Sequence, residues 1–229
     1  DEVIYAADLA LYDAKTRGRK TASIFNLRMH EEVQERRQLE LELRDALVNG
    51  ELELHYQPLV ATQSMETVGY EALLRWNHPT RGPVSPEQFI PIAEETGQIV
   101  QIGEWVLREA LAEAARWPDH LTVSVNLSPV QTMDKELYGT IVHALAASAV
   151  PAHRLELEIT ETVLMCECED TIALLHKIRA LGVRIALDDF GTGYSSLNYL
   201  RAFPFDKIKI DRCFVGDMAE REDSDTIVK

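Results

Sequence analysis

From residue 51 onward, segments with the pattern of a β-strand alternate with segments that have the pattern of an α-helix. Apolar and polar residues alternate in the strand segments, whereas apolar residues recur three or four positions apart in the helical ones. Strands are predicted at 52–59, 67–76, 121–128, 154–161, 184–190 and 207–215, and helices at 86–96, 99–116, 130–148, 169–181 and 195–202, with a last helix from 217. The turn-like residues 61–66 predict a hairpin of the first two strands. The alternation as a whole predicts an α/β fold with a largely parallel sheet that is closed or covered by helices.

Five of the predicted strands have one apolar and one polar face, because side chains two residues apart point the same way. In 154–161, for example, Leu155 and Leu157 lie opposite Glu156 and Glu158. Most of the polar residues come late in their strands, where the active-site mouth of a barrel would lie. The pattern predicts a barrel with a functional mouth, and the alternative is an open sheet whose polar residues face solvent.

Two adjacent aspartates, Asp188 and Asp189, follow the apolar run 183–187 and precede a turn rich in glycine and hydroxyl groups. Adjacent carboxylates repel each other, and one or two divalent cations remove this repulsion by taking oxygen ligands from both. The alternative is an ordinary acidic turn, since aspartate and glycine are common turn residues. The residues that the other strands bring to the same end favour the metal site.

These other strand ends carry hard oxygen ligands and basic groups. Together with the two aspartates, Glu71, Asn126 and Glu158 form a set that suits Mg²⁺ or Mn²⁺ rather than zinc. Two such ions can activate a water molecule and stabilise both oxygens of a phosphoryl displacement. Lys209 is suited to orienting that water, and Arg75 to binding a phosphate through two hydrogen bonds. Taken singly, each of these two basic residues has a salt bridge as its alternative role, and Asn126 a place in a turn.

Composition limits the class of protein and of partner. The net charge of −15 argues against a nucleic-acid polymer as partner, because phosphate backbones are held by basic surfaces. No apolar run approaches the roughly 20 residues of a membrane helix. Cys166, Cys168 and Cys213 form no disulfide framework and lack the second pair of a zinc site, so reduced thiols and a cytoplasmic location are expected.

The first 49 residues have the pattern of two helices. Residues 1–25 contain an amphipathic helix that is expected to end near Gly18, and 26–49 contain a charged linker helix that ends before Gly50. A single amphipathic helix cannot bury its own apolar face, so its core partner is expected upstream. The string Ala7-Asp8-Leu9-Ala10-Leu11-Tyr12-Asp13-Ala14-Lys15, with Gly18-Arg19-Lys20 after it, resembles the last helix of GGDEF (diguanylate cyclase) domains.

The polar strand ends carry a second resemblance, which covers nearly everything from residue 50 to 229. The motifs occur in the order of the EAL domain family, and they are Gln57-Pro58-Leu59, Glu71-Ala72-Leu73-Leu74-Arg75, Asn126-Leu127-Ser128, Glu158-Ile159-Thr160-Glu161, Asp188-Asp189-Phe190-Gly191-Thr192-Gly193-Tyr194-Ser195-Ser196 and Lys209-Ile210-Asp211. The resemblance implies a modified TIM (β/α)8 barrel whose first strand is antiparallel to the others. About six of its eight strands are expected in this chain, preceded by the helical linker.

The resemblance also implies a function and a role for each motif residue. It implies a cytoplasmic cyclic di-GMP phosphodiesterase that hydrolyses one phosphodiester bond, giving the linear dinucleotide pGpG, in bacterial second-messenger signalling. One Mg²⁺ or Mn²⁺ ion would be held by Glu71, Asn126, Glu158 and Asp188, and a second by Asp189. Lys209 would position the attacking water, Glu161 would hold the loop after Asp189, and Gln57, Arg75 and Asp211 would lie around the substrate. A homodimer formed through the EAL domain is expected, and a GGDEF domain upstream, in a parent protein that could carry a membrane anchor there.

The chain departs from the family pattern at its end. EAL domains continue with two more strand–helix units, which bring a further metal-binding glutamate and a late glutamine, and the chain stops at Lys229 before them. An open barrel has unpaired strand edges, so low activity is expected of these 229 residues alone. The alternative function is a regulatory EAL module that binds cyclic di-GMP without hydrolysing it.

Overall fold

The computed structural model describes residues 2–16, 22–165, 169–191 and 203–211. Several predictions from the sequence fall outside these ranges. They are the end of the first helix near Gly18, the state of the three cysteines, the helices at 195–202 and from 217, and the last part of the strand at 207–215.

One sheet contains every described strand, and its order along the main path is β1-β2-β4-β5-β6-β7. The bounds are β1 Leu52–Val60, β2 Thr67–His78, β3 Gly82–Val84, β4 Thr122–Asn126, β5 Leu155–Thr160, β6 Arg184–Phe190 and β7 Lys207–Ile210. Strand β2 is antiparallel to β1 and to β3, whereas the pairs β2–β4, β4–β5, β5–β6 and β6–β7 are parallel. The α/β fold with an antiparallel first strand is therefore confirmed, and within the described residues the sheet is open between β1 and β7.

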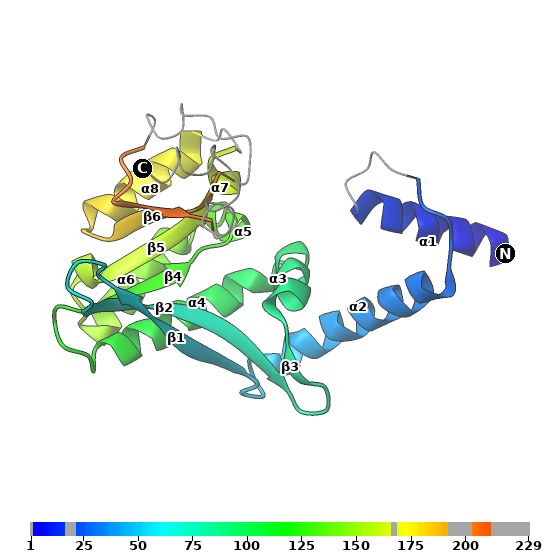
Figure 1. The fold of residues 1–229 in the computed structure, drawn as a ribbon, viewed down its shortest axis with the longest axis horizontal. Helices are drawn as coiled ribbons and strands as arrows, with labels where there is room; N and C mark the ends of the chain where they lie inside the picture. The colour runs from blue at the N-terminus through cyan, green and yellow to red at the C-terminus, as the bar shows by residue number, and fades with distance from the viewer. Residues whose placement is uncertain (1, 17–21, 166–168, 192–202, 212–229) are drawn as a thin grey trace.

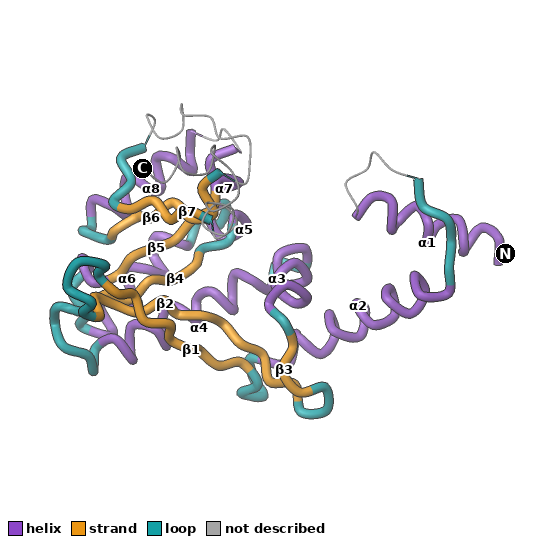
Figure 2. The backbone as a smooth tube through the Cα atoms, viewed as in Figure 1, coloured by secondary structure: helices purple, strands orange, loops and turns teal. Residues whose placement is uncertain are grey.

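Helices cover one face of this sheet, as Figure 2 shows for α4, α6 and α8. The helices after β3 are α3 Pro86–Glu95, α4 Gln98–Ala114, α5 Pro129–Thr132, α6 Leu137–Ser148, α7 Glu161–Met165 and α8 Glu169–Ala180, with a 3-10 turn at Ala152–Arg154. The odd residues of β5, which include Leu155 and Leu157, face the helices and are completely buried. Burying side chains of this size stabilises the fold by about 1.5–3 kcal/mol each.

One local prediction needs correction, and some short elements were not predicted. The helix expected over 130–148 is two helices, because Ser128 caps α5 together with Gln131 and the chain then turns at Asp134, whose Oδ1 accepts from the Glu136 amide. The short strand β3, which pairs with the end of β2, was not predicted. Neither was α7, which begins directly after β5.

The N-terminal helices are α1 Glu2–Thr16 and α2 Leu27–Ala46. Asn26 caps α2 by accepting a hydrogen bond from the Met29 amide. Figure 1 shows α1 and the first half of α2 projecting away from the sheet. The second half of α2 packs on the domain, where Leu39 and Leu43 belong to its apolar core. Among the described helices, none is both long and apolar enough to cross a membrane.

Candidate metal centre

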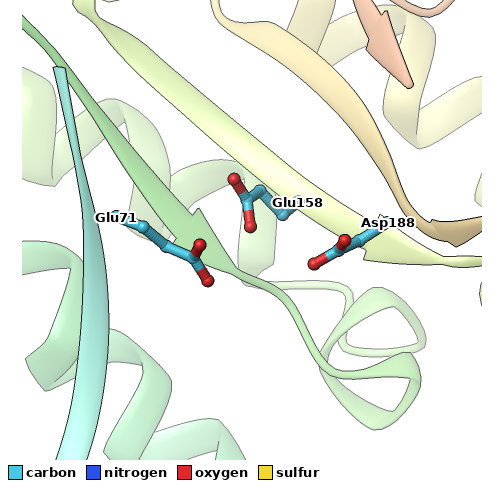
Figure 3. Close-up of side chains that lie close together, drawn as sticks. All are labelled: Glu71, Glu158 and Asp188. Atoms are coloured by element: carbon cyan, nitrogen blue, oxygen red, sulfur yellow. The ribbon is translucent and has the colours of Figure 1, made fainter. Parts of the chain in front are cut away.

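Three carboxylates from three different strands meet at the carboxyl end of the parallel sheet. Glu71 of β2, Glu158 of β5 and Asp188 of β6 each contribute an oxygen to a group in which all lie within 4.8 Å of one another. Figure 3 shows the three side chains pointing toward a common point between the strands. The polar-face periodicity predicted this convergence, since parallel strands present their late residues at one edge of a sheet.

Asn126 is the last residue of β4 and lies beside Glu158 in the strand register. Its Nδ2 donates a hydrogen bond of 2.8 Å to Oε1 of Glu71. This contact orients the Glu71 carboxylate and places the amide at the edge of the carboxylate cluster. The fourth residue expected to hold the first ion thus contacts Glu71 and lies beside Glu158.

Lys209 of β7 lies among the same carboxylates. Its Nζ donates to Oε2 of Glu158 at 2.5 Å, to Oδ2 of Asp188 at 2.8 Å and to Oε2 of Glu71 at 3.2 Å. Burial alone would lower the pKa of Lys209, but its hydrogen bonds to Asp188 and Glu158 and the neighbouring negative charges raise it above its usual value. The ammonium group is therefore positively charged throughout the neutral range.

Glu158 is the most deeply buried member of the cluster, with 1% of its surface exposed. Burial raises the pKa of Glu158 to about 7, the hydrogen bond from Lys209 opposes this rise, and the charges of Glu71 and Asp188 add to it. Its Oε1 is buried and has no hydrogen-bond partner among the described residues. An orphaned buried carboxylate oxygen is costly in a folded protein.

This donor set fits a divalent metal ion. Three carboxylates carry more negative charge than the single ammonium of Lys209 can neutralise, and Glu158 Oε1 is available as a ligand. All of the donors are hard oxygens, so Mg²⁺ and Mn²⁺ suit the site better than zinc.

Asp189, Asp211 and Glu161 lie next to the cluster. Asp189 has a left-handed backbone with φ of 54°, and its amide donates to Oδ1 of Asp188 at 2.9 Å. Burial and the charges of Asp188 and Asp211 raise the pKa of Asp189. Glu161, the first residue of α7, accepts a hydrogen bond of 3.0 Å from the Gly191 amide through Oε1. It thus contacts the chain directly after the two aspartates.

The two other predicted substrate residues lie on β1 and β2. Gln57 is exposed on β1, where it pairs in register with Glu71. Arg75 lies four residues beyond Glu71 on β2, and its Nη1 donates to the Leu74 carbonyl. Arg75 and Asn126 line one cavity of about 320 Å³, which is mostly apolar. Arg75 therefore shares a cavity with Asn126, which contacts the carboxylate cluster.

A second polar layer lies beneath the carboxylates and was not singled out as a site from the sequence. Glu156 of β5 is 2% exposed, and its Oε1 accepts hydrogen bonds from Ser124 Oγ at 2.9 Å and from Lys207 Nζ. Glu156 and Lys207 each precede a cluster residue by two positions, so the same period-two alternation contained the signal. The polar face of the sheet therefore carries two successive sets of charged residues, the carboxylate cluster with Lys209 and, one step earlier along the strands, Glu156 with Lys207.

Comparison with known proteins identifies the family. Residues 40–229 match the family model of the EAL domain. The chain is 42% identical over 231 residues to the bifunctional diguanylate cyclase/cyclic di-GMP phosphodiesterase MucR of Pseudomonas aeruginosa, a match that covers 99% of this chain and 34% of MucR. It is 42% identical over 222 residues to the cyclic di-GMP phosphodiesterase NbdA of the same organism, covering 95% of this chain and 28% of NbdA.

A solved structure supports the same assignment. The PaMucR phosphodiesterase in complex with c-di-GMP superimposes with a TM-score of 0.79 at 44% identity, covering 83% of this chain and 79% of that one. The chain spans about a third of the length of MucR, and less of NbdA. A family match over most of its residues, with the strand order and the motif residues described above, shows that this chain belongs to the EAL domain family.

Proposed function

We propose that this EAL domain hydrolyses one phosphodiester bond of cyclic di-GMP and releases the linear dinucleotide pGpG. The observation that carries the proposal is the convergence of Glu71, Glu158 and Asp188 around Lys209, with one buried oxygen of Glu158 lacking a partner among the described residues. The similarity to MucR and NbdA, which are named as cyclic di-GMP phosphodiesterases, supports this substrate.

The metal-binding residues are proposed as the resemblance implies. Glu71, Asn126, Glu158 and Asp188 would hold one Mg²⁺ or Mn²⁺ ion, and Asp189 a second. When bound, such ions lower the pKa of a water molecule and stabilise negative charge on phosphoryl oxygens. The pairing of Asn126 with Glu71 keeps two of these ligands together and supports the assignment.

The remaining residues position the reactants. Lys209 places its ammonium at the centre of the cluster, where its positive charge would offset negative charge as it develops. Its three donors are engaged by Glu158, Asp188 and Glu71, so it would position the attacking water after one of these contacts is released. Arg75 offers a planar guanidinium to a phosphate in the adjoining cavity, and Gln57 and Asp211 would contact the substrate. Glu161 would hold the backbone at Gly191, where it accepts a hydrogen bond.

The molecular context is part of the proposal. We infer an upstream GGDEF domain, a homodimer formed through the EAL domain and a location in the cytoplasm. MucR, which carries both activities in its name, supports the tandem arrangement. We also infer that the 229 residues alone turn over cyclic di-GMP slowly, since β1 and β7 have free edges within the described part of the sheet.

Turnover measured by separating pGpG from cyclic di-GMP tests the activity. A chain extended past Lys229 should hydrolyse cyclic di-GMP with Mg²⁺ or Mn²⁺ and lose activity with EDTA. Glu71→Gln should reduce kcat roughly 100-fold or more, because it removes a charged ligand from the cluster. Binding of cyclic di-GMP without turnover under either metal would instead identify the regulatory, non-catalytic alternative.

A further inference from the structure

A basic cavity lies at the end of the sheet opposite the metal centre. It has a volume of about 400 Å³ and its lining is mainly basic, comprising His120, His153, Arg154, Arg184 and Lys207 with Asp119, Thr122 and Val68. The chain as a whole carries a net charge of −15. Three charged basic side chains and two histidines surround this cavity against a single lining carboxylate, so its charge is opposite in sign to that of the whole chain.

The cavity is formed by the amino ends of the parallel strands. Thr122, Arg184 and Lys207 are the first residues of β4, β6 and β7, and Arg154 directly precedes β5. Asn126 of the metal centre is the last residue of β4, so the strand separates it from Thr122 by about 13 Å at its usual rise per residue. The basic cavity and the carboxylate cluster are therefore distinct sites.

Arg154 gives the cavity a rigid component. Its side chain is 3% exposed, its Nε donates to the Leu121 carbonyl at 2.8 Å, and its Nη2 donates to the Ala114 carbonyl at 2.7 Å. The third nitrogen, Nη1, lies 3.6 Å from Oδ1 of Asp119, a fully exposed carboxylate. A planar guanidinium held by two carbonyls presents its remaining nitrogen in a fixed direction. An anion can compete for that nitrogen, because Asp119 is free to turn into solvent.

Arg184 and Lys207 supply adaptable donors beside it. Arg184 is exposed, and its positive charge interacts with the nearby carboxylate of Asp206, which also pairs with Arg179. The side chain of Lys207 is 42% exposed, and its Nζ uses one contact on Glu156. An ammonium has three donors, so two of them remain for another acceptor. Thr122 and the two exposed histidines complete a lining rich in donors.

We propose that this cavity binds a phosphate-type anion, with a diphosphate group as the best match. Guanidinium groups bind two oxygens of one phosphate in parallel, and a diphosphate has enough oxygens for both arginines and Lys207. The site requires no divalent cation and no part of the metal centre. Its occupant is inorganic diphosphate or the diphosphate group of a nucleotide, which share this chemistry.

Calorimetric titration of the full chain with sodium diphosphate, in the presence of EDTA, tests the site. We expect saturable binding of one diphosphate per chain, which weakens with added salt. Arg184→Gln should weaken it roughly tenfold or more, since an exposed charge-assisted donor pair is removed without disturbing the core. Arg108→Gln is the matched control, because Arg108 is also exposed but lies on α4 away from the lining residues.

Two further titrations locate the anion and identify its source. Arg75→Gln should leave diphosphate binding unchanged, because Arg75 belongs to the opposite end of the sheet. Tighter binding of a nucleoside diphosphate than of diphosphate would indicate a nucleotide, and equal or weaker binding would indicate the inorganic anion. The proposal is wrong if no saturable binding occurs, if Arg184→Gln binds like wild type, or if Arg75→Gln alone abolishes binding.

Discussion

At the residue scale, Asp189 combines an unusual backbone conformation with a carboxylate beside the cluster. Its φ of 54° is a conformation that aspartate, asparagine and glycine tolerate better than other residues do. The carboxylate also lies close to Asp188 and Asp211, whose charges help to raise its pKa. Aspartate is thus one of the few residue types that combine this backbone with a carboxylate, the group that the proposed second metal ion would need.

Substitutions at Asp189 should separate these two properties. Asp189→Asn, Asp189→Gly and Asp189→Ala all remove the charge, so they relieve the repulsion from Asp188 and Asp211 to the same extent. Only alanine meets a steric penalty at positive φ, so Asp189→Ala should be less stable than the other two by about 1 kcal/mol. Urea unfolding without metal measures the difference. Equal stability of all three variants would show that the backbone at this residue relaxes freely.

The buried Glu158 should make the metal-free protein less stable as the pH rises. Burial raises its pKa from 4.5 to about 7, so between these values the folded state holds a proton that the unfolded state has released. The protonated form therefore contributes its full stability below pH 4.5, the pKa in the unfolded chain. The free energy of unfolding declines from there as the pH rises through about 7, by up to about 3 kcal/mol. Glu158→Gln keeps the shape and cannot ionise.

We therefore expect Glu158→Gln to gain stability relative to wild type as the pH increases from about 5 to about 7.5 in EDTA. Urea unfolding curves of the two proteins at several pH values give this difference directly. A constant difference across the range would mean that Glu158 already ionises at its ordinary pKa in the folded chain.

At the element scale, the interior layer beneath the metal centre depends on one ion pair. Glu156 is 2% exposed and its partners are Ser124 and Lys207, from the neighbouring strand β4 and from β7. Lys207→Met would leave this carboxylate buried without its cation, at an expected cost of about 2–3 kcal/mol because Lys207 itself is partly exposed.

A double-mutant cycle isolates the pair. Glu156→Gln with Lys207→Met should be more stable than the sum of the single substitutions predicts, since glutamine needs no counter-charge and still accepts from Ser124. Chemical denaturation of the four proteins supplies the coupling energy. Simple additivity would show that solvent, rather than Lys207, compensates the charge of Glu156.

The sequence predicted the strands better than the connections between them. Alternation along β2 and β5 placed Glu71 and Glu158 on one face, and the end of the apolar run 183–187 placed Asp188 beside them. The break between α5 and α6 was not predicted, since the turn at Asp134 lies inside the apolar periodicity that predicted one helix over 130–148. The sequence pattern could not predict that Lys209 contacts three carboxylates at once. Side-chain distances across β2, β5 and β6 depend on the stagger of the strands, which alternation does not define.

At the scale of the whole molecule, the linker helix and the EAL domain form one packed unit. The second half of α2 buries Leu39, Leu43 and Ala46 in the same core as the strands. Around this contact Glu42 pairs with Arg81 at 3.0 Å, and Arg36 pairs with Glu95 of α3 at 2.6 Å. The match to the family begins at residue 40, inside this helix, which agrees with its place in the core.

Paired substitutions in α2 test whether the linker contributes to the stability of the domain. Leu43 is 1% exposed and Leu41 is 55% exposed, although they lie only two positions apart on the same helix. Leu43→Ala should lower the free energy of unfolding of the whole domain by about 2–4 kcal/mol, because it creates a cavity in the shared core. Leu41→Ala removes the same atoms from an exposed position and should change stability by less than about 0.5 kcal/mol. Denaturation followed by tryptophan fluorescence reports the unfolding of the core rather than of the helix, because Trp76, Trp105 and Trp117 all lie outside α2 and pack in the domain. An unchanged midpoint for Leu43→Ala would mean that α2 unfolds separately, so that movement of the linker could not be transmitted to the domain through this contact.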